Sequence, residues 1–464
     1  MTATADSKGI KQFLEKRLLL GRPLTTELTA ILLVYFVQGI LGLARLAVSF
    51  FLKDDLGLTP ATVAALTGVA SLPWTIKPLF GFLSDGLPIL GYRRRPYLIL
   101  SGFTGTAAWL VLATLVHTAW LAIAMILLSS LSVAVSDVIV DSLVVERARQ
   151  ESQGEAGTLQ SLSWGAAAIG GLLTAYLGGL LLEYTSTRTV FAVTALFPLI
   201  ISVVAWLIAE EPVQAKSNFQ TVWSQVKQLK TAFSQRAIWM PALFLFLWQS
   251  TPSADSAFFF FTTNDLGFAP EFLGRVRLVT SLAALIGIAI FQRFLKAVPF
   301  RIIFAWSTIL ACLGGMTTLI LVTHANRSLG IDDQWFSLGD SAILTVMGQI
   351  AFMPVLVLSA RLCPKGVEAT LFALLMSISN LAGLLSHELG ALLTHWLHVT
   401  EADFDNLWLL VTITNLTTLL PLPLLFLLPS DSAASNADNT ALETLASSDA
   451  ATEEESPEPA LSSL

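Results

Sequence analysis

Charged residues are scarce in this sequence: 13% of its 464 residues are Asp, Glu, Lys or Arg, whereas 54% are hydrophobic. The mean hydropathy of +0.71 is too high for a soluble chain, because a water-exposed surface needs more polar side chains. Only two cysteines occur, Cys312 and Cys363, so neither a disulfide framework nor a zinc site is implied. The composition therefore indicates a membrane protein.

Enzyme signatures are scarce as well. The chain has no phosphate-binding GxxxxGK[ST] motif, and its "HELGA" at His387 lacks the second histidine that a zinc-protease helix needs four residues later. No loop is long enough for the nucleotide domain of an ATP-driven pump. We therefore expect no enzyme activity, cofactor or metal, and we expect His387, His395 and His398 to be structural or interfacial residues.

Long apolar runs are what the sequence has instead. About twenty apolar residues cross a hydrocarbon core as a helix, and two sets of six such runs occur. The first set covers residues 27–51, 59–83, 96–117, 119–144, 157–182 and 189–209, and the second covers 238–261, 270–292, 301–323, 338–360, 369–394 and 406–428. The runs predict an all-α membrane protein with about twelve transmembrane helices in two halves, 27–209 and 238–428, joined by a polar linker, 210–237.

The Lys and Arg residues outside these runs lie mostly on one side of the predicted membrane. That side collects the basic residues of the 1–26 segment and the linker, together with Arg93, Arg94, Arg95, Arg147, Arg149, Arg293, Lys296, Arg301, Arg361 and Lys365. The other side has Lys53, Arg188 and Arg327. Because basic loops stay in the cytoplasm, we expect both termini and the linker to be cytoplasmic.

The two ends of the chain indicate where the protein resides. The N-terminus shows no removable signal peptide or organelle-targeting segment, so we expect a bacterial cytoplasmic membrane, with a plastid envelope as the alternative. The tail, 429–464, holds eight acidic residues and no base, and is expected to be disordered and cytoplasmic. The remaining chain is nearly neutral and gives no sign of nucleic-acid binding. We expect a monomer embedded in the lipid bilayer.

One hexamer occurs twice. "DLGLTP" at 55–60 returns as "DLGFAP" at 265–270, an offset of 210 residues, and residues near 158–181 match residues near 370–393 at an offset of 212. Helix packing alone explains single Gly or Leu matches but not coordinated offsets. Two halves with the same topology are the plan of the major facilitator fold, in which pseudo-symmetric halves rock around a midplane site.

The repeat also predicts where a substrate binds. At the offset of 210, Arg45 corresponds to Asp255, so the first and seventh runs carry opposite charges at equivalent depth. An ionised residue deep in a span costs about 3 kcal/mol, so both should face a wet cavity, either paired or separated by substrate. Gln38 and Gln249, two turns away on the same helices, supply amide donors and acceptors. A purely structural ion pair between the halves is the alternative.

The other charged residues within the apolar runs have two possible roles each. Asp137 and Asp141 share a helix face, and one of them could bind a proton if burial raises its pKa; pairing with Arg147 or with the Arg93–Arg95 cluster is the alternative. Asp255 is a further proton-coupling candidate. Arg275 and Arg277 cannot share a face, so we expect one to reach outward and the other to meet a substrate carboxylate.

The stretch between the second and third runs resembles the gating signature of major facilitators. It contains "KPLFGFLSD" and "GYRRRPYL", and with "YFVQG" at 35–39 and "FFLKDDLGLTP" at 50–60 it is similar to the folate-biopterin transporter family. The resemblance covers most of the membrane body. It implies that an acid and a basic cluster latch the halves together in the outward-facing state. The residues with this implied role are Lys77, Gly81, Asp85, Arg93, Arg94 and Arg95.

This resemblance implies uptake of folate or a related pteridine by alternating access, driven by protons. A flat pterin suits stacking on Trp164 or Trp248 and hydrogen bonds from Asp255, although both tryptophans could equally serve packing. The glutamate tail of folate would favour Arg45 or Arg277. Two alternatives remain at this point: a facilitator for another solute, such as a sugar or organic anion, and a non-transporting assembly or pigment-delivery factor.

Overall fold

The computed structural model describes residues 23–148, 158–212, 223, 227, 230–231, 233–295, 298–361 and 368–428. Residues 1–22, the acidic tail and most of the predicted linker lie outside the described residues. The described chain is helical and contains no strand beyond one isolated bridge between Ile89 and Tyr92.

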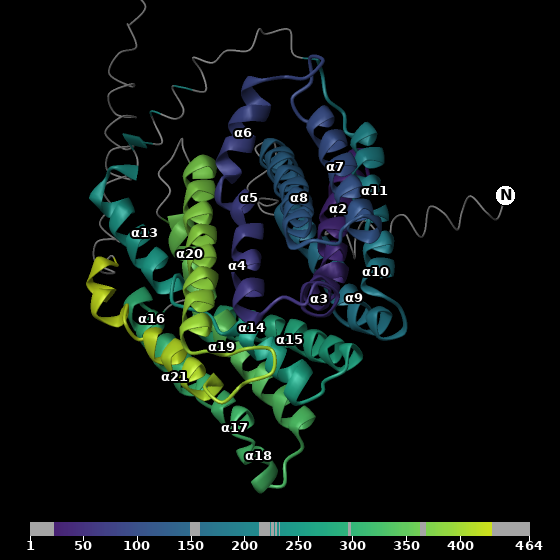
Figure 1. The fold of residues 1–464 in the computed structure, drawn as a ribbon. Helices are drawn as coiled ribbons and strands as arrows, with labels where there is room; N and C mark the ends of the chain where they lie inside the picture. The colour runs from purple at the N-terminus through teal and green to yellow at the C-terminus, as the bar shows by residue number, and fades with distance from the viewer. Residues whose placement is uncertain are drawn as a thin grey trace, which may run out of the picture.

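Six membrane-crossing segments form the N-terminal half (Figure 1). They are α2 (Thr26–Ile40) continued by α3 (Ala44–Phe50), α4 (Pro60–Ala70) continued by α5 (Leu72–Thr75) and α6 (Lys77–Gly86), α7 (Arg95–Thr114), α8 (Ala119–Ala148), α9 (Thr158–Tyr184), and α10 (Thr187–Thr194) continued by α11 (Leu196–Val204). Each segment coincides with one apolar run.

The C-terminal half repeats this order. Its segments are α13 (Arg236–Gln249) followed by α14 (Asp255–Phe260), α15 (Pro270–Ile290), α16 (Phe300–Gly315) followed by α17 (Thr318–Val322), α19 (Asp333–Arg361), α20 (Glu368–Trp396) and α21 (Leu407–Thr417), with the short α18 (Ala325–Ser328) before α19. The two halves meet along two seams, α9 against α15 and α4 to α6 against α20. We call the end with the α6–α7 loop, at the top of Figure 1, the near end, and the end with the α3–α4 and α14–α15 loops the far end.

The predicted repeat is present in the backbone itself. A π-helical turn spans Phe51–Asp55 and another spans Phe261–Asp265, 210 residues later. Two residues after each turn comes a glycine of positive φ, 61° at Gly57 and 65° at Gly267, a conformation that glycine adopts without steric cost. The next helix then starts at a proline in both halves, Pro60 and Pro270. The two halves are therefore pseudo-symmetric copies of one topology.

Eleven helices in the described part are long and apolar enough to cross a membrane. The seventh predicted run is broken, because Pro252 lacks a backbone N–H and disfavours helical geometry at the residue before it. Residues 250–254 thus separate α13 from α14. The opened backbone is satisfied by α20: the Ser386 hydroxyl donates to the Thr251 carbonyl at 2.5 Å, and the Ser253 N–H donates to the Ser386 carbonyl at 3.2 Å.

The same contact occurs in the other half. A Cβ added at Gly390 of α20 would lie 2.0 Å from the Ser253 carbonyl oxygen, and one added at Gly178 of α9 would lie 2.8 Å from the Leu43 carbonyl oxygen. Glycine backbone thus faces a carbonyl of the neighbouring segment at equivalent places in both halves. Helix contacts in membranes depend on such small residues, since they let backbones approach closely.

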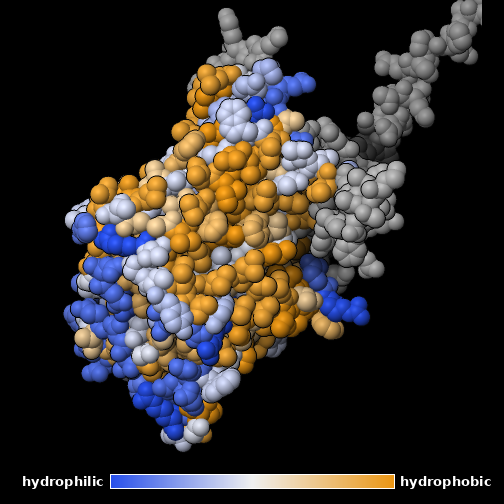
Figure 2. Space-filling view, turned by 90° about the vertical axis from the view of Figure 1, so that its right-hand side faces the viewer, coloured by the Kyte–Doolittle hydropathy of each residue, from blue (hydrophilic) through white to orange (hydrophobic). Residues whose placement is uncertain are grey.

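The outer surface is apolar, as a lipid-facing surface requires. Figure 2 shows a broad hydrophobic area across the middle of the face in view, with hydrophilic residues gathered along one side and at the lower tip. Large exposed apolar side chains occur on several helices, among them Leu79, Phe103, Leu173, Ile286 and Leu313. In water such an area would drive aggregation. The chain is a multi-pass integral membrane protein.

The Gly390 contact gives a stability prediction. We expect Gly390→Ala to lower the melting temperature of the detergent-purified protein, because overpacking costs about 1–3 kcal/mol. Gly383→Ala is the matched control, since it lies on the same helix and an added Cβ there meets nothing within 4 Å. It should leave the melting temperature unchanged or raise it slightly. Equal melting temperatures for the two variants would contradict the close approach of α20 to Ser253.

Candidate functional site

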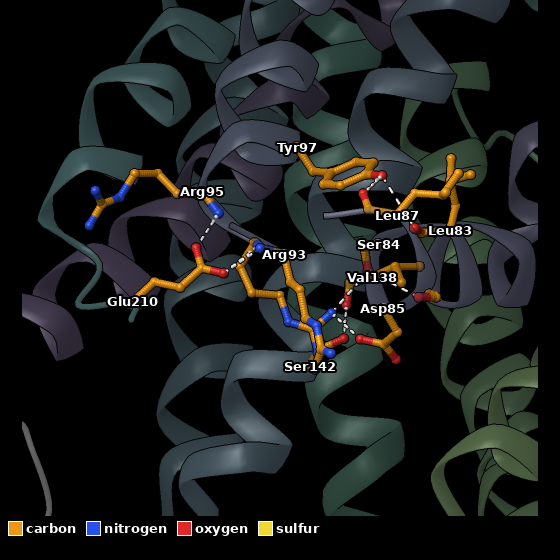
Figure 3. A network of polar contacts seen from close by, with 12 residues as sticks. Leu83, Ser84, Asp85, Leu87, Arg93, Arg95, Tyr97, Val138, Ser142 and Glu210 are labelled. Carbon is orange, nitrogen blue, oxygen red and sulfur yellow. Dashed lines mark hydrogen bonds and ion pairs between the residues drawn. The ribbon is translucent and has the colours of Figure 1, made fainter. Parts of the chain in front are cut away.

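A polar network occupies the near end of the N-terminal half (Figure 3). Arg94 forms an ion pair with Asp85 at 2.9 Å and donates from its guanidinium to the Ser84 hydroxyl, also at 2.9 Å. The Tyr97 hydroxyl donates to the carbonyls of Leu83 and Leu87, at 3.2 and 2.7 Å. The acid and the central arginine of the gating signature therefore contact each other inside one half.

Glu210 is the residue of this network that the sequence analysis missed. Its carboxylate accepts the backbone N–H groups of Arg93, Arg94 and Arg95, at 2.6, 2.9 and 2.9 Å. These groups lie at the start of α7, where the first turn of a helix leaves its N–H groups without intrahelical partners and favours negative charge. More than 110 residues separate Glu210 from the arginines, so only the fold shows that it is their acceptor.

The other members of the signature have different surroundings. The Arg95 guanidinium donates to the Ile208 carbonyl at 2.7 Å and lies 5.2 Å from the Tyr92 ring centre. A Cβ added at Gly81 would lie 3.6 Å from Val138, an ordinary contact, so close approach of helices does not require glycine there.

Lys77 belongs to a second cluster, between α2, α6 and α8. It forms an ion pair with Asp137 and lies 4.8 Å from the Trp74 ring centre, while the Tyr35 hydroxyl donates to Asp141. Asp137 thus pairs with Lys77 and not with the arginines of the near-end network, because α6 places Lys77 directly across from α8. The side chain of Arg147, the other predicted partner, is outside the described part.

Arg45 and Asp255 do not form an ion pair in the described structure. Both side chains are exposed, at equivalent ends of their helical breaks. Arg45 instead lies close enough to Arg277 of α15 for the two positive charges to act on each other. One guanidinium nitrogen of Arg277, Nη1, is buried without a hydrogen-bond partner among the described residues, whereas Arg275 pairs with Glu271 at 2.7 Å. Two cations from opposite halves therefore act on each other, and neither forms an ion pair with an acid among the described residues.

Some of the predicted amide and aromatic site residues already have hydrogen-bond or packing partners, and others do not. Trp248 donates its indole N–H to Thr308 at 2.8 Å and packs edge-on against Phe304, so it serves packing within its own half. Gln249 accepts from the Ser379 hydroxyl at 2.5 Å. By contrast, Nε2 of Gln38 is buried without a partner in the described part, and the side chain of Trp164 is 54% exposed.

The halves are held together mainly at the far end. Lys53 donates to Asn264 at 2.8 Å, Tyr176 donates to Glu271 at 2.9 Å, and the Phe50 and Phe259 rings pack edge-on at 5.2 Å. Within the described residues, the remaining hydrogen bonds between the halves are the one from the Glu271 N–H to Glu183, also at the far end, and the one from Asn380 to the Trp74 carbonyl, midway along the α4–α20 seam. At the near end the seam continues through the apolar contact of Phe82 with the α13–α20 cluster.

Comparisons with known proteins agree with this architecture. A sequence model of the BT1 family matches residues 38–447. The chain is 62% identical to the folate-biopterin transporter of Synechocystis sp. over 91% of this chain and 86% of that protein, and 34% identical to the probable folate-biopterin transporter 2 of Arabidopsis thaliana over 84% of this chain and 80% of that protein. A crystal structure of a variant of the nucleoside transporter NupG superposes with a TM-score of 0.67 at 13% identity, covering 86% of this chain and 99% of that one, which shows the same fold.

Removal of the Glu210 carboxylate should destabilise the near-end network. Glu210→Ala leaves three N–H groups without their acceptor, and hydrogen bonds to a charged group contribute about 1.5–3 kcal/mol, so we expect a melting temperature several degrees lower in detergent. Glu211→Ala is the control, because the exposed neighbouring carboxylate makes no such bonds. Identical melting curves for the two variants would show that the Glu210 contacts contribute little.

Proposed function

The chain belongs to the BT1 family of membrane transporters, and from this membership we propose that it carries folate or a related pteridine across a membrane. Its curated relatives in a bacterium and a plant bear the names of folate-biopterin transporters. The family consists of transporters rather than enzymes, and the major facilitator fold supports secondary transport, in which the site is exposed alternately on the two sides.

The guanidinium nitrogen of Arg277 that is buried without a partner among the described residues, with Arg45 of the other half as its charged neighbour, is the observation that carries this proposal. Like charges repel at short range, and a guanidinium buried without an acceptor is destabilising. An anion bound between the two arginines would remove both costs, and guanidinium groups bind carboxylates through two parallel hydrogen bonds. Folate carries such carboxylates on its glutamate tail. The site therefore favours folate over an uncharged pterin.

Other polar and aromatic side chains of the membrane-spanning helices suit the pterin ring. The partnerless amide of Gln38 and the exposed carboxylate of Asp255 offer donors and acceptors at the level of the two helix breaks. Gln249 is available only in part, since Ser379 already occupies its oxygen. Trp164 provides an exposed aromatic face for stacking. In this arrangement Arg45 and Asp255 are separated by substrate.

The seams support an inward-facing state. If the near end faces the cytoplasm of a bacterial cell, as the basic loops favour, the contacts at the far end close the outer side. The Asp85–Arg94 pair then lies within the N-terminal half. In the opposite state this cluster would close the near end.

We further propose that protons drive the transport. The N-terminal half holds the acids Asp137 and Asp141, the first neutralised by Lys77 and the second hydrogen-bonded to Tyr35. Loss of the Lys77 contact during movement would leave Asp137 to take up a proton. Asp255, exposed at the start of α14, is a third candidate.

Uptake of radiolabelled folate into proteoliposomes tests the whole proposal. With an imposed inward proton gradient we expect accumulation, and without it only equilibration. Excess unlabelled folate should abolish the signal, and excess sugar or an unrelated organic anion should not. Absence of both folate accumulation and folate exchange by correctly inserted protein would overturn the proposed substrate.

Substitution of Arg277 tests the carboxylate contact. We expect Arg277→Gln to raise the KM for folate by roughly tenfold to a hundredfold, because a charge-assisted hydrogen bond contributes about 1.5–3 kcal/mol. Competition by p-aminobenzoylglutamate, which has the tail but no pterin, should weaken in parallel, while competition by biopterin should not change. Arg275→Gln is the control, since that arginine points to Glu271 and is largely exposed. A KM equal to that of the control would contradict the role of Arg277.

A further inference from the structure

Glu388 of α20 is an acid within a membrane helix that the proposed substrate site does not use. It lies in the α4–α20 seam, toward the far end, directly against bare backbone of the other half. A Cβ added at Gly68 of α4 would lie 2.6 Å from its Oε1. Glycine at position 68 therefore leaves the space in which this carboxylate lies.

The surroundings of Glu388 provide little to stabilise a negative charge. Its carboxylate has no hydrogen bond or ion pair with any described residue. Its side chain is half-buried, and the adjacent His387 is the titratable neighbour that acts on it.

Three of the elements packed against α20, namely α4, α5 and α21, contain no charged residue. The described charged side chains that the other elements contribute have partners or are exposed: on α6, Lys77 pairs with Asp137 and Asp85 with Arg94; on α19, Asp333 pairs with Arg327 and Asp340 accepts from Thr317 and Thr318; on α13, Arg236 is exposed. Asp255 of α14, which packs on α4, is exposed.

The other seam shows the contrast. At the offset of 212, Glu388 corresponds to Tyr176 of α9, which donates to Glu271 across the α9–α15 seam. Glu271 also receives a hydrogen bond from Arg275 at 2.7 Å. That seam closes over an acid with two donors, whereas the α4–α20 seam closes over an acid that has no donor in the described part of the chain.

A carboxylate enters such a seam at low cost only in its neutral form. Withdrawal of an ionised carboxylate from water without a partner is strongly unfavourable, while a neutral acid loses far less hydration. We propose that Glu388 is a proton-coupling residue of this transporter, and that binding of one proton to its carboxylate accompanies closure of the far end. This inference rests on the proposed function for the identity of the cargo and for the coupling of transport to protons.

The proton balance of this step is simple. Water at the open far end supplies a proton, an O–H bond forms on the carboxylate, and the side-chain charge changes from −1 to zero. The neutral acid is enclosed as α4 and α20 meet. When water from the near end reaches the seam, the proton returns to water and the charge is restored. Each cycle thus moves one proton in the same direction as the substrate.

Glu388→Gln separates coupling from transport, because glutamine imitates the neutral acid but carries no proton. A gradient of about one pH unit can drive about tenfold accumulation through a one-proton carrier. We expect the variant to lose this accumulation and keep exchange of labelled for unlabelled folate. Asp340→Asn is the control: this acid of α19 is hydrogen-bonded by Thr317 and Thr318 of its own half, and its replacement should leave coupling intact.

Two results of this assay would overturn the inference. One is gradient-driven accumulation by Glu388→Gln equal to that of the wild type. Loss of accumulation by Asp141→Asn would strengthen that conclusion. The other is joint loss of exchange and accumulation by folded Glu388→Gln protein, which would indicate a different role for the residue. Absence of exchange by the wild type would instead refute folate as the cargo.

A second measurement tests Glu388 without any substrate. Spin labels at Thr62→Cys of α4 and Leu392→Cys of α20, with the native cysteines replaced, report the distance across the far end of the seam. We expect acidification to shift the population toward the short distance. Glu388→Gln should give the short distance at every pH. A spin-label distance distribution that does not change with pH in the wild-type background would refute proton-linked closure.

Discussion

The hydrocarbon core requires a partner for every backbone polar group and every charge, and this constraint governs the structure. The break between α13 and α14 is accommodated because Ser386 satisfies the Thr251 carbonyl and the Ser253 N–H, while glycine at position 390 lets α20 approach Ser253 closely. The equivalent contact of Gly178 with the Leu43 carbonyl supports the bend between α2 and α3. Irregular backbone at membrane depth is tolerated only where protein or water satisfies it. The breaks thus identify the level at which a polar substrate can be bound.

Charges within the membrane follow the same constraint, and their partners distinguish structural from functional roles. Lys77 with Asp137, and Arg275 with Glu271, are neutralised where they lie. Arg45, Arg277 and Glu388 have no such partner in the described part of the chain. Because an unpaired charge there is costly, we propose that a carboxylate of the cargo neutralises the two arginines and that a proton neutralises the acid.

The two seams relate binding to movement. Arg45 and Arg277 belong to different halves, and Arg277 lies one turn from Gly274, where α15 touches Gly179 of α9. An anion bound by both arginines would therefore draw the two halves together next to the contact between Gly274 and Gly179. On the α4–α20 seam, protonation of Glu388 would remove the negative charge that opposes closure. Cargo and proton would then favour the same movement through separate contacts.

The sequence by itself determined the helices, the two pseudo-symmetric halves and the set of intramembrane charges, because apolar runs of fixed length and a repeat at a fixed offset are local properties of the chain. It also carried the motifs from which the family resemblance was inferred. Only the tertiary structure decided the partners: Glu210 for the backbone of the three arginines, Lys77 for Asp137, Arg277 as the neighbour of Arg45, and Gly68 against Glu388. These contacts join helices far apart in the chain, and helix rotation, which no local pattern fixes, selects which side chains meet.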